Sequence, residues 1–129
     1  MTEPQPLTEL SAVRYISLAT FRRDGTEVPT PVWFCEIDGS LYCFSAGDAG
    51  KVKRIRNNGR GRIAECTMNG RITGAWQAVT ASLVTDSAQI EKVYSELRRK
   101  YGWQMHIADI LARISGRYTR RAVIELRQS

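Results

Sequence analysis

The first half of the chain alternates short apolar runs with turn residues, a pattern typical of antiparallel strands. Asp-Gly pairs at 24–25 and 38–39 are strong hairpin signals. Pro29 and Pro31 lie inside the second run and cannot donate hydrogen bonds to a neighbouring strand, so we expect that part of the strand to be paired on one side only. The expected strands span residues 15–22, 28–37 and 41–45.

The second half combines further strands with two helices. Asp86 can cap a helix, and Gln89 stands three residues further on, as in a capping box. Gly102 is expected to end this helix. The helix carries an apolar stripe of Ile90, Val93, Tyr94, Leu97 and Tyr101, and a second stripe consists of Ile107, Ile110, Leu111 and Ile114 before Gly116. Further strands are expected over residues 62–68, 73–85 and 118–126.

About six short strands joined by tight turns favour a closed or partly closed antiparallel β-barrel, with helices flanking the barrel and closing its ends. At 129 residues the chain fits one domain, which we place over residues 10–129 after an N-terminal arm of residues 1–9. A short helix is expected over residues 7–13. No apolar run approaches the ~20 residues that a membrane span needs, and the N-terminus lacks the apolar segment of a signal peptide. We therefore expect a cytoplasmic location.

The positive charge is concentrated in one segment. The chain has a net charge of +6, and between residues 49 and 64 there are six basic residues and no acidic one. The 13 remaining Lys and Arg residues balance the 13 Asp and Glu residues, so the segment accounts formally for the whole net charge. This indicates a local anion-binding site rather than a general surface bias. The six residues are Lys51, Lys53, Arg54, Arg56, Arg60 and Arg62.

The pattern around this segment is a strand, a loop of small residues and a short basic helix. The loop at 46–50 has almost no side chains, so backbone N–H groups can approach a ligand closely. The start of a helix adds free N–H groups and a positive dipole end. We place Asp48 at the N-cap of this helix. The glycine spacing matches neither a Walker loop nor a dinucleotide fingerprint, and a solvated basic helix is the plain alternative.

Cysteine and histidine chemistry is not favoured. Cys35, Cys43 and Cys66 are odd in number, lack metal-ligand spacing and sit in apolar runs, so we expect buried thiols. His106 is the only histidine, which argues against a catalytic triad and a multi-histidine metal site. We expect it on a helix surface. No metal site and no catalytic side chain are predicted.

Several motifs follow one another along the chain: Leu18-Ala19-Thr20, Pro31-Val32-Trp33-Phe34, Ser45 six residues before Lys51, Trp76, and Lys100-Tyr101-Gly102. Taken in order, they resemble the flavin and deazaflavin oxidoreductases with the pyridoxamine 5'-phosphate oxidase-like split barrel. The resemblance is strongest to the subgroup that uses coenzyme F420, and it covers roughly residues 10–126. It implies a six-stranded antiparallel split β-barrel with Greek-key connections and flanking helices. One departure is Val79, where many relatives have glycine.

The resemblance also implies a cofactor site. Members of the family are homodimers with the cofactor in a groove between subunits. The phosphate would lie at Ser45, Lys51 and Arg54, and the ring along the second strand at the backbone of Thr30, Pro31 and Val32. Trp76 and Gln77 would come from the other subunit. A tail of carboxylates beyond the phosphate would use the further cations, among them Lys53 and Arg56.

The implied activity is hydride transfer between the deazaflavin F420 and a small organic acceptor, with FMN as the alternative cofactor of an oxidase or reductase. In such chemistry the cofactor reacts while the protein binds and orients. Two other functions stay open. A basic barrel can bind nucleic acid, although aromatic residues are missing among the cations of 46–62. A non-catalytic flavin- or haem-binding protein is the other. We expect neither a nucleic-acid nor a membrane partner.

Overall fold

The computed structural model describes residues 6–46, 49–114 and 121–129, which form one antiparallel sheet with helices around it. The strand order in the sheet is β2-β1-β5-β6-β7-β4-β3. The strands are β1 (Ile16–Phe21), β2 (Glu27–Val32), β3 (Phe34–Ile37), β4 (Ser40–Ala46), β5 (Arg60–Glu65), β6 (Gln77–Val84) and β7 (Arg121–Gln128). The helices are the 3-10 turn η1 (Leu7–Leu10), α1 (Gly50–Asn58), α2 (Ser87–Tyr101) and α3 (Trp103–Ile114). The predicted antiparallel split barrel with flanking helices is confirmed.

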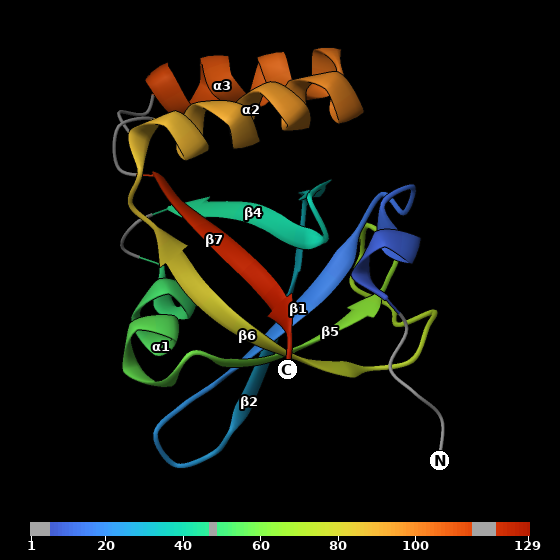
Figure 1. The fold of residues 1–129 in the computed structure, drawn as a ribbon, viewed down its shortest axis with the longest axis vertical. Coiled ribbons are helices and arrows are strands. Elements are labelled where there is room, and N and C mark those ends of the chain that lie inside the picture. The colour runs from blue at the N-terminus through green and yellow to red at the C-terminus, as the bar shows by residue number, and fades with distance from the viewer. Residues whose placement is uncertain (1–5, 47–48, 115–120) are drawn as a thin grey trace.

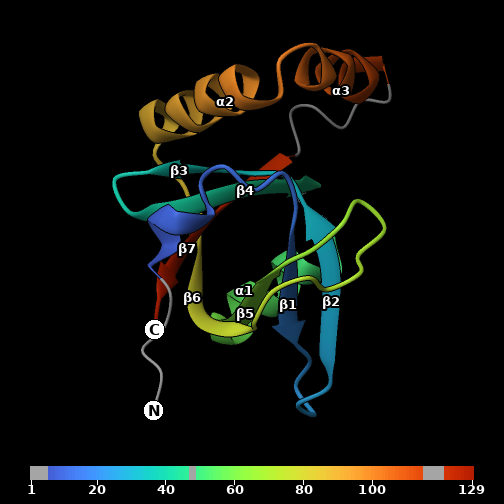
Figure 2. The same cartoon turned by 90° about the vertical axis from the view of Figure 1, so that its right-hand side faces the viewer.

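The strand count differs from six because the predicted strand over 28–37 is two strands. It breaks at Trp33, and its halves β2 and β3 form the two opposite edges of the sheet. A single residue therefore joins the first edge to the last, which curls the sheet into a barrel (Figure 2). Edge positions suit the prolines of β2, since β2 pairs only with β1.

Tyr101 fixes the point where the chain crosses between the edges. Its ring stacks on Trp33 with centroids 4.7 Å apart. Its hydroxyl accepts a hydrogen bond from the Phe34 N–H at 3.0 Å and lies 2.9 Å from the Arg14 carbonyl oxygen, to which it can donate. Backbone groups of Arg14 and Phe34 at the barrel seam are thus satisfied by one side chain from the end of α2.

One apolar core fills the barrel, and two short elements close its ends. The buried residues of this core come from every strand, from η1 and from α1. Ile55 of α1 packs into one end, and Leu7 and Leu10 of η1 belong to the same core. Part of the segment predicted as an N-terminal arm is therefore packed into the barrel, and residues 1–5 lie outside the described residues. In Figure 1, α1 and η1 lie at opposite ends of β1 and β5.

A second core lies between α2 and the outer face of β3, β4 and β7. The predicted stripe on α2 is confirmed, with Val93, Tyr94, Leu97 and Tyr101 buried. The capping prediction is also confirmed, because the Asp86 carboxylate accepts a hydrogen bond from the Gln89 N–H at 3.0 Å. α2 and α3 cover this face of the sheet together (Figures 1 and 2).

The stripe predicted on α3 is exposed. Met105 and Asp109 face inward, and Asp109 pairs with Arg98 and Arg121. The opposite face keeps its large apolar side chains in solvent, and His106 is exposed as predicted. The side chain of Ile114 and the predicted stop at Gly116 are outside the described residues. Exposed fractions are 69% for Trp103, 47% for Ile107, 56% for Ile110 and 61% for Leu111. No helix in the described ranges is long and apolar enough to cross a membrane.

Two strand boundaries differ from the predictions in a way that shapes the surface. The strand expected over 73–85 begins only at Gln77, and the strand expected over 62–68 ends at Glu65. Between them the chain forms a wide loop, held by the isolated bridge between Cys66 and Ile72. All three cysteines are buried thiols, as predicted. The predicted strand over 118–126 is seen as β7, with residues 118–120 outside the described residues.

Candidate functional site

The structure brings four polar side chains together where α1 closes the barrel. Lys51 Nζ lies 3.3 Å from Ser45 Oγ at the end of β4. Arg54 donates from Nε to the hydroxyl of Thr20 on β1 at 2.6 Å. Ser45 and Thr20 are both buried, so each cation is held by a fixed hydroxyl. Of the predicted phosphate-binding residues, Ser45, Lys51 and Arg54 thus share one site, which we call the α1 cradle together with Thr20.

The α1 cradle carries positive charge without a described counter-charge. Burial lowers the pKa of Lys51, and the nearby Arg54 charge lowers it further. Burial also lowers the pKa of Arg54, with a contribution from Arg22. No ion pair within residues 6–46, 49–114 and 121–129 joins a carboxylate to Lys51 or Arg54. An anion in the cradle would relieve the repulsion between the two cations.

The residue at the N-cap of α1 supplies no side-chain cap to the backbone donors of the helix start. Ala49 occupies the N-cap position and makes no side-chain hydrogen bond, so the prediction of Asp48 at this position is wrong. Asp48 itself lies outside the described residues. The Arg54 guanidinium passes directly over Gly50, where a Cβ atom would come within 2.7 Å of Nη1. The glycine therefore makes room for the cation beside the first turn of the helix.

The other four cations of the basic segment lie outside the α1 cradle, and only one of them is paired with a described carboxylate. Lys53 and Arg56 lie on the exposed face of α1, away from the cradle. Arg60 covers the ring of Phe21 at 4.7 Å. Arg62 is neutralised, because it donates from Nε and Nη2 to the Glu27 carboxylate at 2.6–3.0 Å. Arg62 is one of the six basic residues of the predicted anion-binding segment, but it is already paired with the carboxylate of Glu27, 35 positions earlier in the chain.

The predicted ring-binding strand presents backbone rather than side chains. Thr30 directs its hydroxyl back to the Leu18 carbonyl oxygen at 3.5 Å, and Val32 is buried in the barrel core. Pro31 is exposed and lacks an N–H group. As β2 is an edge strand, backbone groups that do not face β1 are open to a ligand or another chain.

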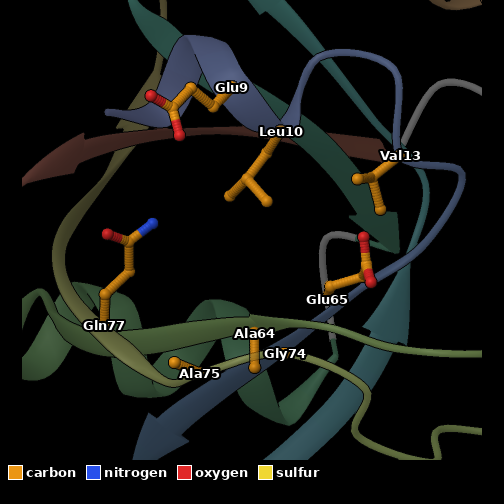
Figure 3. A pocket seen from close by; sticks show the side chains of 8 residues that line it. All are labelled: Glu9, Leu10, Val13, Ala64, Glu65, Gly74, Ala75 and Gln77. Atoms are coloured by element: carbon orange, nitrogen blue, oxygen red, sulfur yellow. The ribbon is translucent and has the colours of Figure 1, made fainter. Parts of the chain in front are cut away.

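Trp76 and Gln77 lie on different surfaces. The guanidinium of Arg62 covers the Trp76 ring at 4.6 Å, on the same sheet face as Glu27. Gln77 instead points into a cavity between η1 and β6 (Figure 3). Val79, the departure from the family pattern, is buried opposite Gly61, where a Cβ would lie 3.4 Å from its methyl group. The small residue on β5 thus accommodates the larger one on β6.

Thr20 and Glu27 are the site residues that sequence reasoning did not assign. Thr20 belongs to one of the family motifs and stands in register with Gly61, but only the fold shows that Arg54 reaches it. Glu27 precedes the prolines of β2, and its partner lies two strands away across β1. The one feature of the sequence that could have indicated Thr20 was its position at the end of an expected strand.

Comparisons with known proteins identify the fold. No protein-family model matches the chain, and no curated protein matches it significantly. Solved structures do match. A candidate pyridoxamine 5'-phosphate oxidase from Listeria innocua is 17% identical, with 93% of this chain and 87% of that chain covered and a TM-score of 0.61. An FAD-binding protein from Mesorhizobium loti is 19% identical, with 95% and 84% covered and a TM-score of 0.61. The haem storage protein HutZ from Vibrio cholerae is 12% identical, with 99% and 92% covered and a TM-score of 0.68. The chain has the split-barrel fold that these structures share.

Proposed function

We propose that the protein is an oxidoreductase that transfers a hydride between coenzyme F420 and a small organic acceptor. The observation that carries the proposal is the α1 cradle. Two cations with lowered pKa values are held by buried hydroxyls beside an uncapped helix start, and no described carboxylate pairs with them. A phosphate group satisfies all of these groups at once.

Each residue of the cradle has a separate part in binding. Lys51 supplies a point charge, and Arg54 keeps its terminal nitrogens for a phosphate, because only its Nε is used on Thr20. Ser45 orients Lys51 and can donate its own hydroxyl. Within the described residues the Val52 N–H donates to the Ala49 carbonyl oxygen at 3.1 Å, so the N–H groups of Gly50 and Lys51 are the ones that can add donors with fixed directions.

The position of β2 supports the placement of the ring. Thr20 at the cradle is in register with Val28, and the chain runs from there along the edge strand to Thr30 and Val32. Backbone groups of this open edge can bind the polar rim of a flavin-type ring. Such a ring, when bound, accepts or supplies the hydride, and the protein holds it with one face open to the acceptor.

The exposed cations of α1 favour a deazaflavin with an acidic tail over FMN. Lys53 and Arg56 extend positive charge beyond the cradle along one face of the helix, and Arg60 follows at the start of β5. FMN ends at its phosphate and would leave this charge unused. A chain of carboxylates beyond the phosphate would lie along it. Because Arg62 is paired with Glu27, three cations of the segment rather than four remain to bind the tail.

A titration of the purified protein with F420 and with FMN at two salt concentrations tests this function. F420 is expected to bind more tightly and to lose more affinity on adding salt, since more exposed charges are paired. Lys51→Ala is expected to weaken binding about ten- to a hundredfold, as loss of a charge-assisted phosphate contact (~1.5–3 kcal/mol) implies. Lys92→Ala on the exposed face of α2 is the matched control. Arg98 is unsuitable, because it pairs with Asp109.

Other outcomes point to the alternative functions. If FMN copurifies with the protein, or binds at least as tightly as F420 at both salt concentrations, the proposed function becomes that of an FMN-dependent oxidase or reductase. Tight cofactor binding without turnover of any acceptor favours a flavin- or haem-binding protein. Equal small effects of Lys51→Ala and Lys92→Ala reject the α1 cradle as the phosphate site.

We also propose that the protein acts as a homodimer with the cofactor between the subunits. Two surfaces of the single chain support this. β2 is an edge strand of the sheet, and its outer backbone groups are not paired with another described strand. The outer face of α3 leaves Trp103, Ile110 and Leu111 in solvent. A dimer with an interface of ~2,000 Å² or more is expected. Light scattering at micromolar concentration checks it, and a monomer contradicts it.

A further inference from the structure

The turn between β1 and β2 lies beside α1 at the cradle end of the barrel (Figure 1). Two contacts hold the end of β1 against α1. The Asn58 side chain donates from Nδ2 to the Phe21 carbonyl oxygen at 3.4 Å, and Arg54 donates to the Thr20 hydroxyl at 2.6 Å. The residue that follows β1 is therefore held close to the α1 cradle, and that residue is a further cation, Arg22.

The backbone of Arg22 continues the strand and sets the direction of its side chain. Its N–H donates to the Thr26 carbonyl oxygen at 2.9 Å, which extends the pairing of β1 with β2 by one residue. Its own carbonyl oxygen accepts from the Gly25 N–H at 2.9 Å. Successive side chains of a strand point to opposite faces, so Arg22 shares the face of Thr20, while Phe21 points to the other face. The side chain of Arg22 therefore starts on the cradle side of the sheet.

The electrostatics agree with this placement. Burial lowers the pKa of Arg54, and the charge of Arg22 lowers it further, as is expected of two guanidinium groups that lie close together. Asp24 in the same turn uses Oδ1 to accept from the Thr26 N–H at 2.9 Å. This hydrogen bond is the main cause that lowers the pKa of Asp24, and Arg22 adds a smaller effect. No ion pair within residues 6–46, 49–114 and 121–129 includes Arg22.

Cations from two separate elements thus converge on the α1 cradle. Like charges in one site repel each other, and an anion bound between them removes the repulsion. We infer that Arg22 is a further binding residue for the phosphate of the cofactor, which it reaches from the β1–β2 turn while Lys51 and Arg54 reach it from α1. A guanidinium group suits this part, because its planar fork of donors matches phosphate oxygens. The inference rests on the phosphate site of the proposed function and not on the choice between F420 and FMN.

A fluorescence titration at low ionic strength, with whichever of F420 and FMN the wild type binds more tightly, tests this residue. Arg22→Gln is expected to weaken binding about threefold to tenfold, less than Lys51→Ala, because Arg22 is exposed and its charge is screened by solvent. Arg22→Lys restores the charge without the planar fork, so it is expected to recover part of the lost affinity. Arg23→Gln is the matched control, since Arg23 has the same charge, is also exposed and lies one residue farther into the turn. Its affinity should stay within about twofold of that of the wild type.

Salt and heat separate a direct contact from a structural effect. The affinity of Arg22→Gln is expected to fall less steeply with added salt than that of the wild type and of Arg23→Gln, since one charge pair fewer is screened. All three proteins should share one thermal unfolding midpoint, because backbone groups hold the turn. Equal small effects of Arg22→Gln and Arg23→Gln, with Lys51→Ala still weakening binding, would overturn the part of Arg22 and leave the phosphate site in place. If the wild type binds neither cofactor, or Lys51→Ala has no effect, the α1 cradle is rejected and the inference falls with it.

Discussion

The two ends of the barrel differ in charge although they are built on the same strands. At one end of β1, Thr20 accepts a hydrogen bond from the cation Arg54, and Lys51 lies in the same cradle. At the other end, Ile16 stands in register with Glu65, which lines a cavity whose described lining residues include no Lys or Arg. Four residues of strand, roughly 13 Å, separate the two levels. A single apolar core thus separates the cations of the α1 cradle from the carboxylate of Glu65.

The two ends are also closed by different means. At the cradle a regular helix closes the barrel, and its C-terminal junction with β5 is tight. Gly59 has a φ of 64°, its N–H donates to the Ile55 carbonyl oxygen, and its own carbonyl accepts from the Ala81 N–H at 2.8 Å. At the cavity only the 3-10 turn of Leu7–Leu10 and an irregular loop close the barrel. We expect the cradle to be the more rigid of the two.

The largest effect is expected at the junction after α1. Gly59→Ala places a side chain in a left-handed conformation and brings a Cβ within 3.0 Å of the Ala81 carbonyl oxygen. We expect a loss of about 2 kcal/mol or more in the free energy of unfolding, measured by urea denaturation. Gly25→Ala in the turn before β2, also at positive φ but with no atom within 4 Å, is the control for backbone strain alone. Equal losses would show that α1 is not held tightly to β6.

A pair of glycine substitutions tests whether the two ends act independently. In Gly50→Ala the new Cβ displaces the Arg54 guanidinium, so cofactor affinity is expected to fall severalfold while stability is kept. In Gly74→Ala the new Cβ would lie 3.2 Å from the Glu65 Cβ at the other end, so the thermal unfolding midpoint is expected to fall while cofactor affinity is kept. Each variant is titrated with F420 and unfolded by heat. A loss of cofactor affinity in Gly74→Ala would contradict the separation of the ends.

The smallest effect is a pH dependence at the cradle. Because the pKa of Lys51 is lowered from its ordinary 10.5, the folded protein releases this proton before the unfolded chain does. The free energy of unfolding of the wild type, minus that of Lys51→Met, therefore rises with pH between the lowered pKa and 10.5. Below the lowered pKa, the full destabilisation by the charged amine is present. A phosphate bound beside Lys51 raises this pKa again and so cancels the rise of stability with pH. Unfolding of both proteins at pH 7 to 10, with and without phosphate, measures it.

The comparison with the variant is needed because other groups titrate in the same range. Burial raises the pKa of the Cys43 thiol to about 12, so the unfolded chain loses this proton first as the pH passes 9. That contribution lowers stability as the pH rises, with a sign opposite to that of Lys51. A difference between wild type and Lys51→Met that does not change with pH would contradict the assignment.

The sequence was sufficient for features set by local pattern. Alternation of apolar residues located the strands, and Asp86 with Gln89 located the start of α2. The cradle was found because Lys51 and Arg54 are three residues apart on one helix, so their common face follows from helix geometry.

Features that depend on distant contacts were not predictable in the same way. Nothing local distinguishes Trp33 from the strand residues on either side, and the break there follows from closure of the sheet. The pairing of Arg62 with Glu27 joins strands that are not neighbours in the chain. The stripe on α3 has the period of a buried face, yet the single chain leaves it in solvent, because period alone does not say what covers a face.

The position of β7 has a consequence for synthesis of the protein. β7 lies between β6 and β4, and it comes after all the other described strands in sequence. Until it leaves the ribosome, the nascent chain can form only two separate half-sheets, β2-β1-β5-β6 and β4-β3, linked at Trp33. The nascent halves expose interior-facing residues such as Leu41 and Ala81, both of which later pair beside Leu126. Completion of the barrel is therefore expected only after translation has passed residue 128.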